Sequence, residues 1–170
     1  MARLFVAVWP PEEILERVAA VPRPDVEGLR WTQPHQWHVT LRFLGRVDEV
    51  DDAVASLSGM GAAEPAEAEL GPQVGHFGRR VLHVPVSGLD RLAGRVAAAT
   101  AEVGEPPEDR PFAGHLTLAR TSKSARVDLR RLAGGAIDGG WAVAELCLME
   151  SRVSAAGARY EEVRRFALTG

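Results

Sequence analysis

Two short stretches decide the fold: HVTL at 38–41, within WHVTLRFLG at 37–45, and HLTL at 115–118, within HLTLAR at 115–120. Both read His-apolar-Thr-apolar, and the second follows the first after 77 positions. Because a β-strand sends alternate side chains to opposite faces, each stretch predicts a strand with His and Thr on one face and two apolar residues facing a core. The repeat therefore predicts two related strands, each offering an imidazole beside a hydroxyl.

The hydrophobic pattern on either side predicts alternating strands and helices. A first helix is opened by Pro11 and ended by Pro22, and two more are expected over roughly 48–59 and 89–103. Residues 61–69 indicate a surface connection or a weak strand. The expected strands are 3–9, 29–32, 37–44 (stopped by Gly45), a short run before the turn at 75–78, 81–86, one carrying 115–118, 141–153 and 159–168. Strands joined by short turns favour antiparallel pairing, and hence an α+β fold.

The composition is that of a globular domain without a strong charge. Of the 170 residues, 46% are apolar and 25% are charged, and the net charge of −3 gives no overall basic field for long nucleic acids. The single cysteine, Cys147, rules out an intramolecular disulfide and favours a reducing compartment. We therefore expect one domain over residues 1–170, a cytoplasmic monomer with neither a signal peptide nor a membrane span.

His38 and His115 are the candidate catalytic pair, with Thr40 and Thr117 beside them. An imidazole has an unperturbed pKa of about 6.5, so one histidine can accept a proton while another donates one near neutral pH. The threonine hydroxyls can donate hydrogen bonds to oxygens on which charge develops. His35 and His38 do not predict a zinc site, because the chain has one cysteine and no second histidine pair. No cofactor is expected, since the chain has no Gly-rich phosphate loop and no nucleotide-binding motif.

These motifs resemble those of the 2H phosphoesterase superfamily, and within it the bacterial and archaeal RNA 2′,3′-cyclic phosphodiesterases, once called 2′-5′ RNA ligases. The resemblance extends from RLFVAVWPP at 3–11, through RPFAGHLTLAR at 110–120, to ESRVSAAGARYEEVRRFAL at 150–168. It implies two pseudo-symmetric lobes of antiparallel sheet, each backed by helices, around a central cleft that both HxT strands face. One departure is Gly114, where the family usually has Pro before the second His, and we expect the glycine to give this strand more backbone freedom.

The resemblance also implies an activity and roles for individual residues. The activity is metal-independent hydrolysis of RNA 2′,3′-cyclic phosphate ends to 2′-phosphomonoesters, with His38 as the acid on the leaving 3′ oxygen and His115 as the residue that positions or deprotonates water. The division of these two roles stays open. Arg120 would bind phosphate and Phe43 would stack on a base. Strand parity alone places Phe43 and Arg120 on the face opposite the histidines, unless the strands bulge.

Other functions remain open at this point. The same chemistry could act on another small cyclic phosphate, such as ADP-ribose 1″,2″-cyclic phosphate or a small nucleotide, and could run weakly in reverse to join 2′-5′ RNA ends. A non-catalytic RNA-end-binding module is a further alternative. The expected partners are RNA ends or small cyclic-phosphate nucleotides, and neither a membrane nor a metal. The basic stretch 120–131 is interpreted first as a solvated face and second as a rim that contacts RNA, and His83 as a structural residue.

Overall fold

The computed structural model describes residues 2–169. Within them the helices are α1 Glu12–Ala19, α2 Val50–Ser58 and α3 Asp90–Ala99, with short 3₁₀ turns η1 Pro34–Gln36 and η2 Leu129–Arg131. The strands are β1 Ala2–Val8, β2 Leu29–Trp31, β3 Val39–Val47, β4 Ala66–Leu70, β5 Gly75–Phe77, β6 Val81–Ser87, β7 His115–Thr121, β8 Gly139–Val143, β9 Glu145–Ser154 and β10 Gly157–Ala167.

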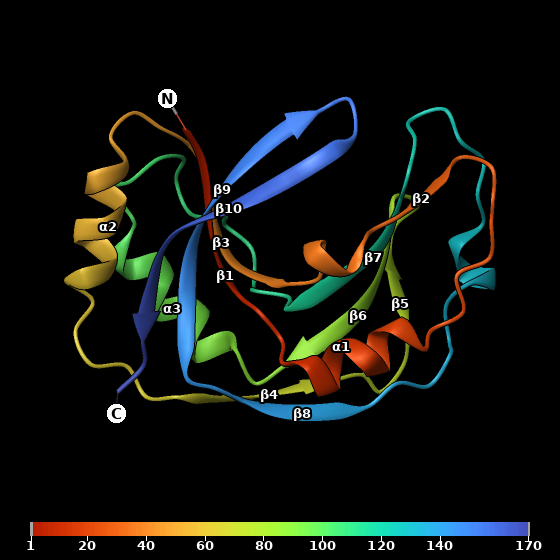
Figure 1. Ribbon diagram of the computed structural model, residues 1–170, viewed down its shortest axis with the longest axis horizontal. Helices are drawn as coiled ribbons and strands as arrows, with labels where there is room; N and C mark the ends of the chain where they lie inside the picture. Colours follow the sequence, from red (N-terminus) through yellow and green to blue (C-terminus); the bar gives the residue numbers. More distant parts are fainter. Residues whose placement is uncertain (1, 170) are drawn as a thin grey trace.

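The strands form a curled antiparallel sheet in the order β10-β9-β1-β3-β7-β6-β4-β8, with β2 beside β7 and β5 beside β6 (Figure 1). We call β1, β3, β9 and β10 lobe 1, and β2 with β4 to β8 lobe 2. The lobes are joined where β3 meets β7, at the pair Val39 and Leu116 in the described part of the chain. The two strands predicted from the repeat therefore lie side by side at the centre of the molecule.

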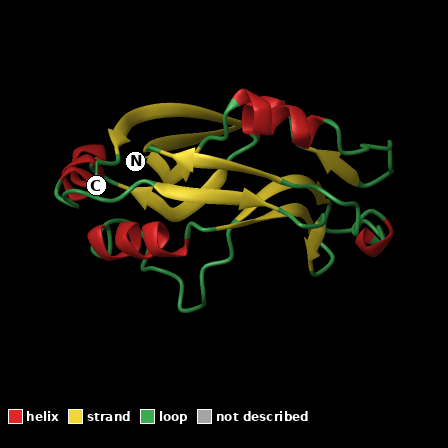
Figure 2. Ribbon diagram, turned by 90° about the horizontal axis from the view of Figure 1, so that it is seen from below, coloured by secondary structure: helices red, strands yellow, loops and turns green. Residues whose placement is uncertain are grey.

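The helices bury apolar stripes against both lobes. In α1, Ile14 and Val18 are buried, and the acidic first turn and basic last turn suit the helix dipole. This helix contacts β8 of lobe 2, whereas α3 contacts β3 and α2 contacts β10 of lobe 1. Figure 2 shows α1 and α3 on opposite sides of the strands. None of the helices in residues 2–169 has the length and apolar character needed to cross a bilayer.

Each lobe is covered by a helix that follows a strand of the other. The chain leaves β1 of lobe 1 to form α1 on lobe 2, and leaves β6 of lobe 2 to form α3 on lobe 1. If the chain were divided between the lobes, lobe 2 would lose α1 and lobe 1 would lose α3, and each lobe would expose apolar surface that these helices cover. We therefore propose that the whole chain is one bilobal domain.

Each HxT strand contains a β-bulge at the last residue of its motif. On β3, the residues on either side of Leu41 pair with two consecutive residues of β1, so Leu41 is an extra residue without a partner there. On β7, the residues on either side of Leu118 likewise pair with two consecutive residues of β6, so Leu118 is the extra residue. A bulge shifts the alternation of side chains by one position. As a result, the residue five places after each histidine, Phe43 or Arg120, faces the same side as that histidine.

Several strands differ from those expected. β3 does not stop at Gly45 but runs through it to Val47, because Gly45 adopts φ +69° at a second bulge, a conformation that favours glycine. The predicted strand 141–153 is two strands, β8 and β9, and Ala144 carries the chain between them from lobe 2 to lobe 1. The segment 61–69 is predicted to be a surface connection or a weak strand, and its second half, continued by one residue, forms β4 Ala66–Leu70.

The third helix ends at Ala99, earlier than the predicted 103. The buried Arg42 guanidinium donates hydrogen bonds to the Thr100 carbonyl at 3.3 Å and to the Glu105 carbonyl at 2.8 Å. These carbonyls accept hydrogen bonds from the buried positive charge on β3 and not from the backbone N–H groups of a longer helix. The end of α3 is therefore fixed by a residue far away in the sequence.

Candidate active site

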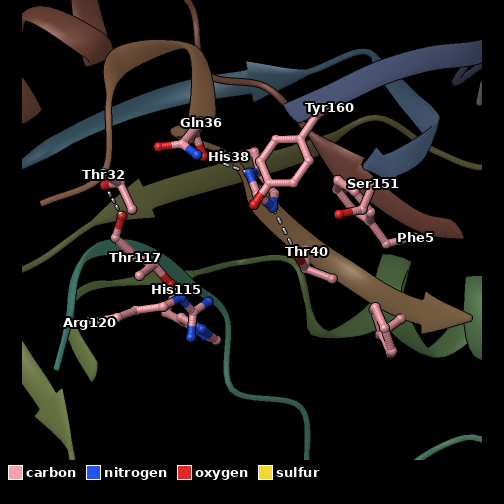
Figure 3. Close-up of a pocket in the computed structure, with 11 residues that line it drawn as sticks. Phe5, Thr32, Gln36, His38, Thr40, His115, Thr117, Arg120, Ser151 and Tyr160 are labelled. Carbon is pink, nitrogen blue, oxygen red and sulfur yellow. Dashed lines mark hydrogen bonds between the residues drawn. The ribbon is translucent and has the colours of Figure 1, made fainter. Parts of the chain in front are cut away.

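A cavity of about 180 Å³ lies between the two lobes. Every residue that the sequence analysis assigns to the site lines it: His38, Thr40, Phe43, His115, Thr117 and Arg120. Figure 3 labels all of these side chains except that of Phe43. The lining is completed by residues that the sequence analysis did not single out: Phe5, Thr32, Gln36, Ser151 and Tyr160. The two motifs thus contribute to one site.

Each histidine is fixed by a hydrogen bond from Nδ1 to the backbone carbonyl two residues before it. His38 Nδ1 donates to the Gln36 oxygen at 2.7 Å, and His115 Nδ1 donates to the Ala113 oxygen at 2.8 Å. A carbonyl can only accept, so Nδ1 carries the proton in both rings. The neutral rings therefore leave Nε2 unprotonated and able to accept a proton.

The seam between β3 and β7 sets each histidine against the threonine of the other motif. Antiparallel pairing at the centre of the seam places His38 opposite Thr117 and Thr40 opposite His115. Thr40 also donates its hydroxyl to Nε2 of the neutral His38 ring at 3.0 Å. Two imidazoles and two hydroxyls are thus grouped around one small volume (Figure 3).

Both histidines are neutral at pH 7 when the cavity holds no ligand. Burial is the largest of the effects that together lower the pKa of His38 to about 4; the charges of Arg120 and of a protonated His115 also lower it, and the hydrogen bond to the Gln36 carbonyl raises it. Burial also lowers the pKa of His115, again with a contribution from Arg120. An anion bound between the rings would oppose these effects, because a nearby negative charge favours the protonated imidazole.

Three aromatic rings surround His38. The ring centroids of Phe5, Trp9 and Tyr160 each lie 5.1 Å from that of His38, and Figure 3 shows Tyr160 directly beside it. These rings help to bury the imidazole, and burial is the largest cause of its depressed pKa. The sequence analysis missed them; the chain's single tyrosine, in a strand far from both motifs, is the one signal that could have drawn attention.

The hairpin that carries Tyr160 is attached to the other side of the cleft. Arg30 Nη2, from β2, donates to the Ala156 carbonyl at 2.9 Å. Gln36 Nε2, from η1, donates to the Ala158 carbonyl at 2.9 Å. The β9–β10 hairpin therefore holds its aromatic residue over His38 through contacts with elements on both sides of the seam.

Strict alternation along each strand would turn Phe43 and Arg120 away from the histidines, but the bulges turn both side chains back toward the cavity, which both of them line. Phe43 is 40% exposed, and the Arg3 guanidinium lies 5.5 Å from its ring centroid. The bulge on β7 is held by Thr32, whose hydroxyl donates to the Leu118 carbonyl at 2.9 Å. An aromatic face and a guanidinium thus flank the histidine pair.

Gly114 serves close packing at the start of β7. A Cβ at this position would overlap the Val86 carbonyl oxygen and would lie 3.2 Å from the Phe112 ring. The Val86 N–H donates to the Gly114 carbonyl at 2.9 Å, so the two backbones cannot separate without losing this hydrogen bond. The glycine, predicted to loosen the strand, lies in a tight backbone contact directly beside His115.

The basic stretch after β7 is partly paired. Arg130 and Arg131 contact Asp128 at 3.0 and 3.8 Å, which supports the solvated-face interpretation for them. Lys123 and Arg126 are exposed. None of these four residues lines the cavity.

Comparison with known proteins places this geometry in a family. A family model described as the 2′-5′ RNA ligase superfamily matches residues 10–155. The chain belongs to this superfamily. A relative from Bacillus subtilis, named RNA 2′,3′-cyclic phosphodiesterase, is 34% identical over 131 residues, which cover 68% of this chain and 69% of that protein.

Two further proteins match over nearly the whole chain. A relative from Escherichia coli, also named RNA 2′,3′-cyclic phosphodiesterase, is 30% identical and covers 98% of this chain and 97% of its own. The crystal structure of TT0787 from Thermus thermophilus superposes with a TM-score of 0.83 at 31% identity, covering 99% of this chain and 98% of that one. This structural match confirms the predicted α+β fold of two lobes around a cleft.

Proposed function

We propose that this member of the 2′-5′ RNA ligase superfamily hydrolyses the 2′,3′-cyclic phosphate at an RNA end to a 2′-phosphomonoester, with His38 and His115 as acid and base. The observation that carries the proposal is the pair of imidazoles across one cavity, each with Nδ1 bound to a carbonyl, so that Nε2 is the nitrogen that exchanges a proton. In the neutral His38 ring Nε2 accepts the Thr40 hydroxyl, and protonation of this nitrogen frees that hydroxyl to donate to the substrate. The name shared by the relatives, RNA 2′,3′-cyclic phosphodiesterase, supports the choice of substrate.

The two histidines supply both proton transfers of an in-line displacement. His115 Nε2 takes a proton from water as the new O–P bond forms. His38 Nε2–H gives a proton to the 3′ oxygen as the P–O3′ bond breaks. His38 gains this proton when the anionic phosphate binds, because the negative charge raises the pKa of the buried ring. The proposed reaction therefore needs no metal to activate water or to stabilise the leaving group.

The other lining residues bind the substrate. The hydroxyls of Thr40 and Thr117 and the guanidinium of Arg120 donate hydrogen bonds to the non-bridging oxygens, where negative charge increases in the transition state. Phe43, backed by Arg3, offers an aromatic face for the terminal base. If the 5′-hydroxyl of a second RNA replaced water as the nucleophile, the same two proton transfers would form a 2′-5′ phosphodiester as the P–O3′ bond breaks, so weak 2′-5′ joining would use the same groups.

The size of the cavity supports a second candidate substrate. A volume of about 180 Å³ accommodates a phosphate and its ribose and does not require a longer chain. A small cyclic nucleotide would then be opened by the same two histidines. We infer that a single chain suffices for either reaction, because it supplies both imidazoles, and that the unpaired Cys147 thiol suits a reducing compartment such as the cytoplasm.

The proposal is tested with an oligoribonucleotide that ends in a 2′,3′-cyclic phosphate, incubated with the protein and EDTA. The expected product is the 2′-phosphomonoester, distinguished from the 3′ isomer by chromatography against standards. The 3′-phosphorylated RNA, which lacks the cyclic ester, is the control and should remain unchanged. A folded protein that binds the RNA and leaves the cyclic end intact would contradict the RNA assignment, and 2′,3′-cyclic AMP tested in parallel would show whether the smaller substrate is turned over instead.

A further inference from the structure

An aromatic stack stands on lobe 2 beside His115, outside the cavity lining. The Phe77 ring of β5 lies on the ring of His83, with centroids 3.9 Å apart and planes inclined by 26°. The same phenylalanine meets His115 edge to face, with centroids 4.8 Å apart. Phe77 is 40% exposed, the same exposed fraction as Phe43. Each lobe therefore presents one exposed phenylalanine near the histidine pair.

The register of the sheet places Phe77 on the cleft side. Arg30 pairs with Arg120, Arg120 with Val81, and Val81 with Phe77, across four adjacent strands. Residues directly opposite each other in an antiparallel sheet share one face. Since Arg120 lines the cavity, Phe77 belongs to the same surface.

His83 fixes the position of Phe77 from below. The His83 side chain is 6% exposed, and its buried Nδ1 has no hydrogen-bond partner within the described residues. Burial lowers the pKa of His83 to about 4, so the ring is a neutral, flat surface at pH 7. Gly75 leaves room for it, because a Cβ there would lie 3.1 Å from the His83 Cε1 atom. One face of Phe77 is thus supported in advance, which lowers the entropic cost of stacking a ligand on the other.

Two cationic side chains follow Phe77 in the sequence. Thr121 donates its hydroxyl to the Arg79 carbonyl at 2.8 Å and its N–H to the Arg80 carbonyl at 2.9 Å, so the backbone of the turn is held. Both arginine side chains are exposed, and neither forms an ion pair within residues 2–169. Phe77 and the two arginines belong to one turn, in which the Arg80 N–H donates to the Phe77 carbonyl at 3.3 Å. An aromatic face and guanidinium groups on the same turn are the chemistry that binds a base and its phosphate.

We propose that Phe77 is the stacking platform for a second RNA base, that of the nucleotide next to the cyclic-phosphate end, with Arg79 and Arg80 beside the phosphate that joins the two nucleotides. The inference rests on the proposed function, because it places the RNA end between His38 and His115. The terminal base would lie on lobe 1 and its neighbour on lobe 2. The site then favours an RNA end over a mononucleotide.

The test compares kcat/KM for a dinucleotide ending in a 2′,3′-cyclic phosphate with kcat/KM for 2′,3′-cyclic AMP. For the wild type, kcat/KM for the dinucleotide divided by kcat/KM for 2′,3′-cyclic AMP is expected to be about 5 to 100, which is the contribution of one stacked base. Phe77→Leu should bring this ratio close to one, and Phe77→Tyr should preserve it. Phe43→Leu is the matched control on lobe 1, and it should lower kcat/KM for both substrates without lowering the ratio.

A wild-type ratio near one would overturn the proposal. An equal decrease in kcat/KM for both substrates in Phe77→Leu would overturn it too, because a phenylalanine that only supports the His115 ring would affect both reactions alike. A second measurement separates this result from failure of the proposed function. A dinucleotide 2′-phosphate with 2-aminopurine at its 5′ position should lose fluorescence on binding to the wild type and keep it with Phe77→Leu. This difference, in a protein that hydrolyses neither substrate, would support the base subsite and contradict the proposed reaction, while equal quenching by both proteins would refute the subsite.

Discussion

Replacing Gly114 by alanine tests how the fold positions the second histidine. The added Cβ would overlap the Val86 carbonyl oxygen, and the hydrogen bond between these two residues prevents the strands from separating freely. Overpacking of this kind costs about 1–3 kcal/mol. For a domain of this size each kcal/mol lowers the unfolding midpoint by about 2–4 °C, so Gly114→Ala should melt about 2–12 °C below the wild type.

The same substitution should reduce activity by more than the loss of stability explains. Gly114 lies between His115 and Ala113, whose carbonyl holds the His115 ring. A misplacement of about 1 Å can cost a hundredfold in rate, so we expect kcat/KM to fall by about tenfold to a hundredfold at a temperature where the variant is fully folded. Thermal unfolding followed by circular dichroism, together with hydrolysis of the cyclic-phosphate RNA, measures both effects.

Gly94→Ala is the matched control. Gly94 lies in the middle of α3 and is exposed, and a Cβ added to it would have nothing within 4 Å. Alanine there should raise the free energy of unfolding by up to about 1 kcal/mol through helix propensity, with unchanged activity. A Gly114→Ala protein with the midpoint and the activity of the wild type would refute the argument that this close approach positions His115.

Three other predictions concern charge and hydrogen bonding. His38 and His83 have pKa values of about 4 in the folded state, below the value of about 6.5 in the unfolded chain, so the unfolded chain binds more protons between pH 6.5 and 4. The free energy of unfolding should therefore fall as the pH falls from about 6.5 to 4, by up to about 3 kcal/mol per histidine. Equal urea midpoints at pH 7 and pH 4.5 would contradict this prediction. Thr117→Val removes one hydrogen bond to a charged oxygen and should lower kcat by about tenfold to a hundredfold in steady-state assays, and an unchanged kcat would exclude that role. Arg120→Gln removes a positive charge that lowers the pKa of His115, so this pKa should rise in an NMR titration of the ligand-free protein, whereas an unmoved pKa would show that the two groups do not interact.

The histidine pair could be predicted because its signal is local. His and Thr alternate on each strand, and the apolar residues between and after them follow the pattern of a half-buried strand. In the structure Val39 and Leu116 are fully buried and pair with each other, while the polar residues of both motifs face the cavity. A repeated local pattern was therefore sufficient to find both sides of the site.

The route by which Phe43 and Arg120 reach the cavity could not be predicted in this way. Leu41 and Leu118 are ordinary strand residues in the sequence, and each becomes a bulge only through its register with a distant partner strand. The family resemblance assigned Phe43 and Arg120 to substrate binding, and both line the cavity, while alternation alone placed them on the opposite face. The bulges explain both results.

The rings around His38 depend on contacts between distant segments as well. Phe5 and Trp9 come from the first strand and the residues after it, and Tyr160 comes from the last strand. Nothing in the local sequence of any of the three indicates a neighbouring imidazole. Their effect on the pKa of His38 is a property of the assembled sheet.

The most direct test of the paired-histidine mechanism is the single-turnover rate on one RNA with a 2′,3′-cyclic phosphate end, measured with EDTA for the wild type, His38→Ala, His115→Ala and the double variant. Loss of an acid or a base predicts a decrease of about a hundredfold or more for each single variant. The double variant should be only slightly slower than the slower single variant, because both residues act in the same displacement. A folded single variant that binds the RNA and retains more than about a tenth of the wild-type rate would contradict the mechanism, since general acid–base catalysis contributes at least about a hundredfold.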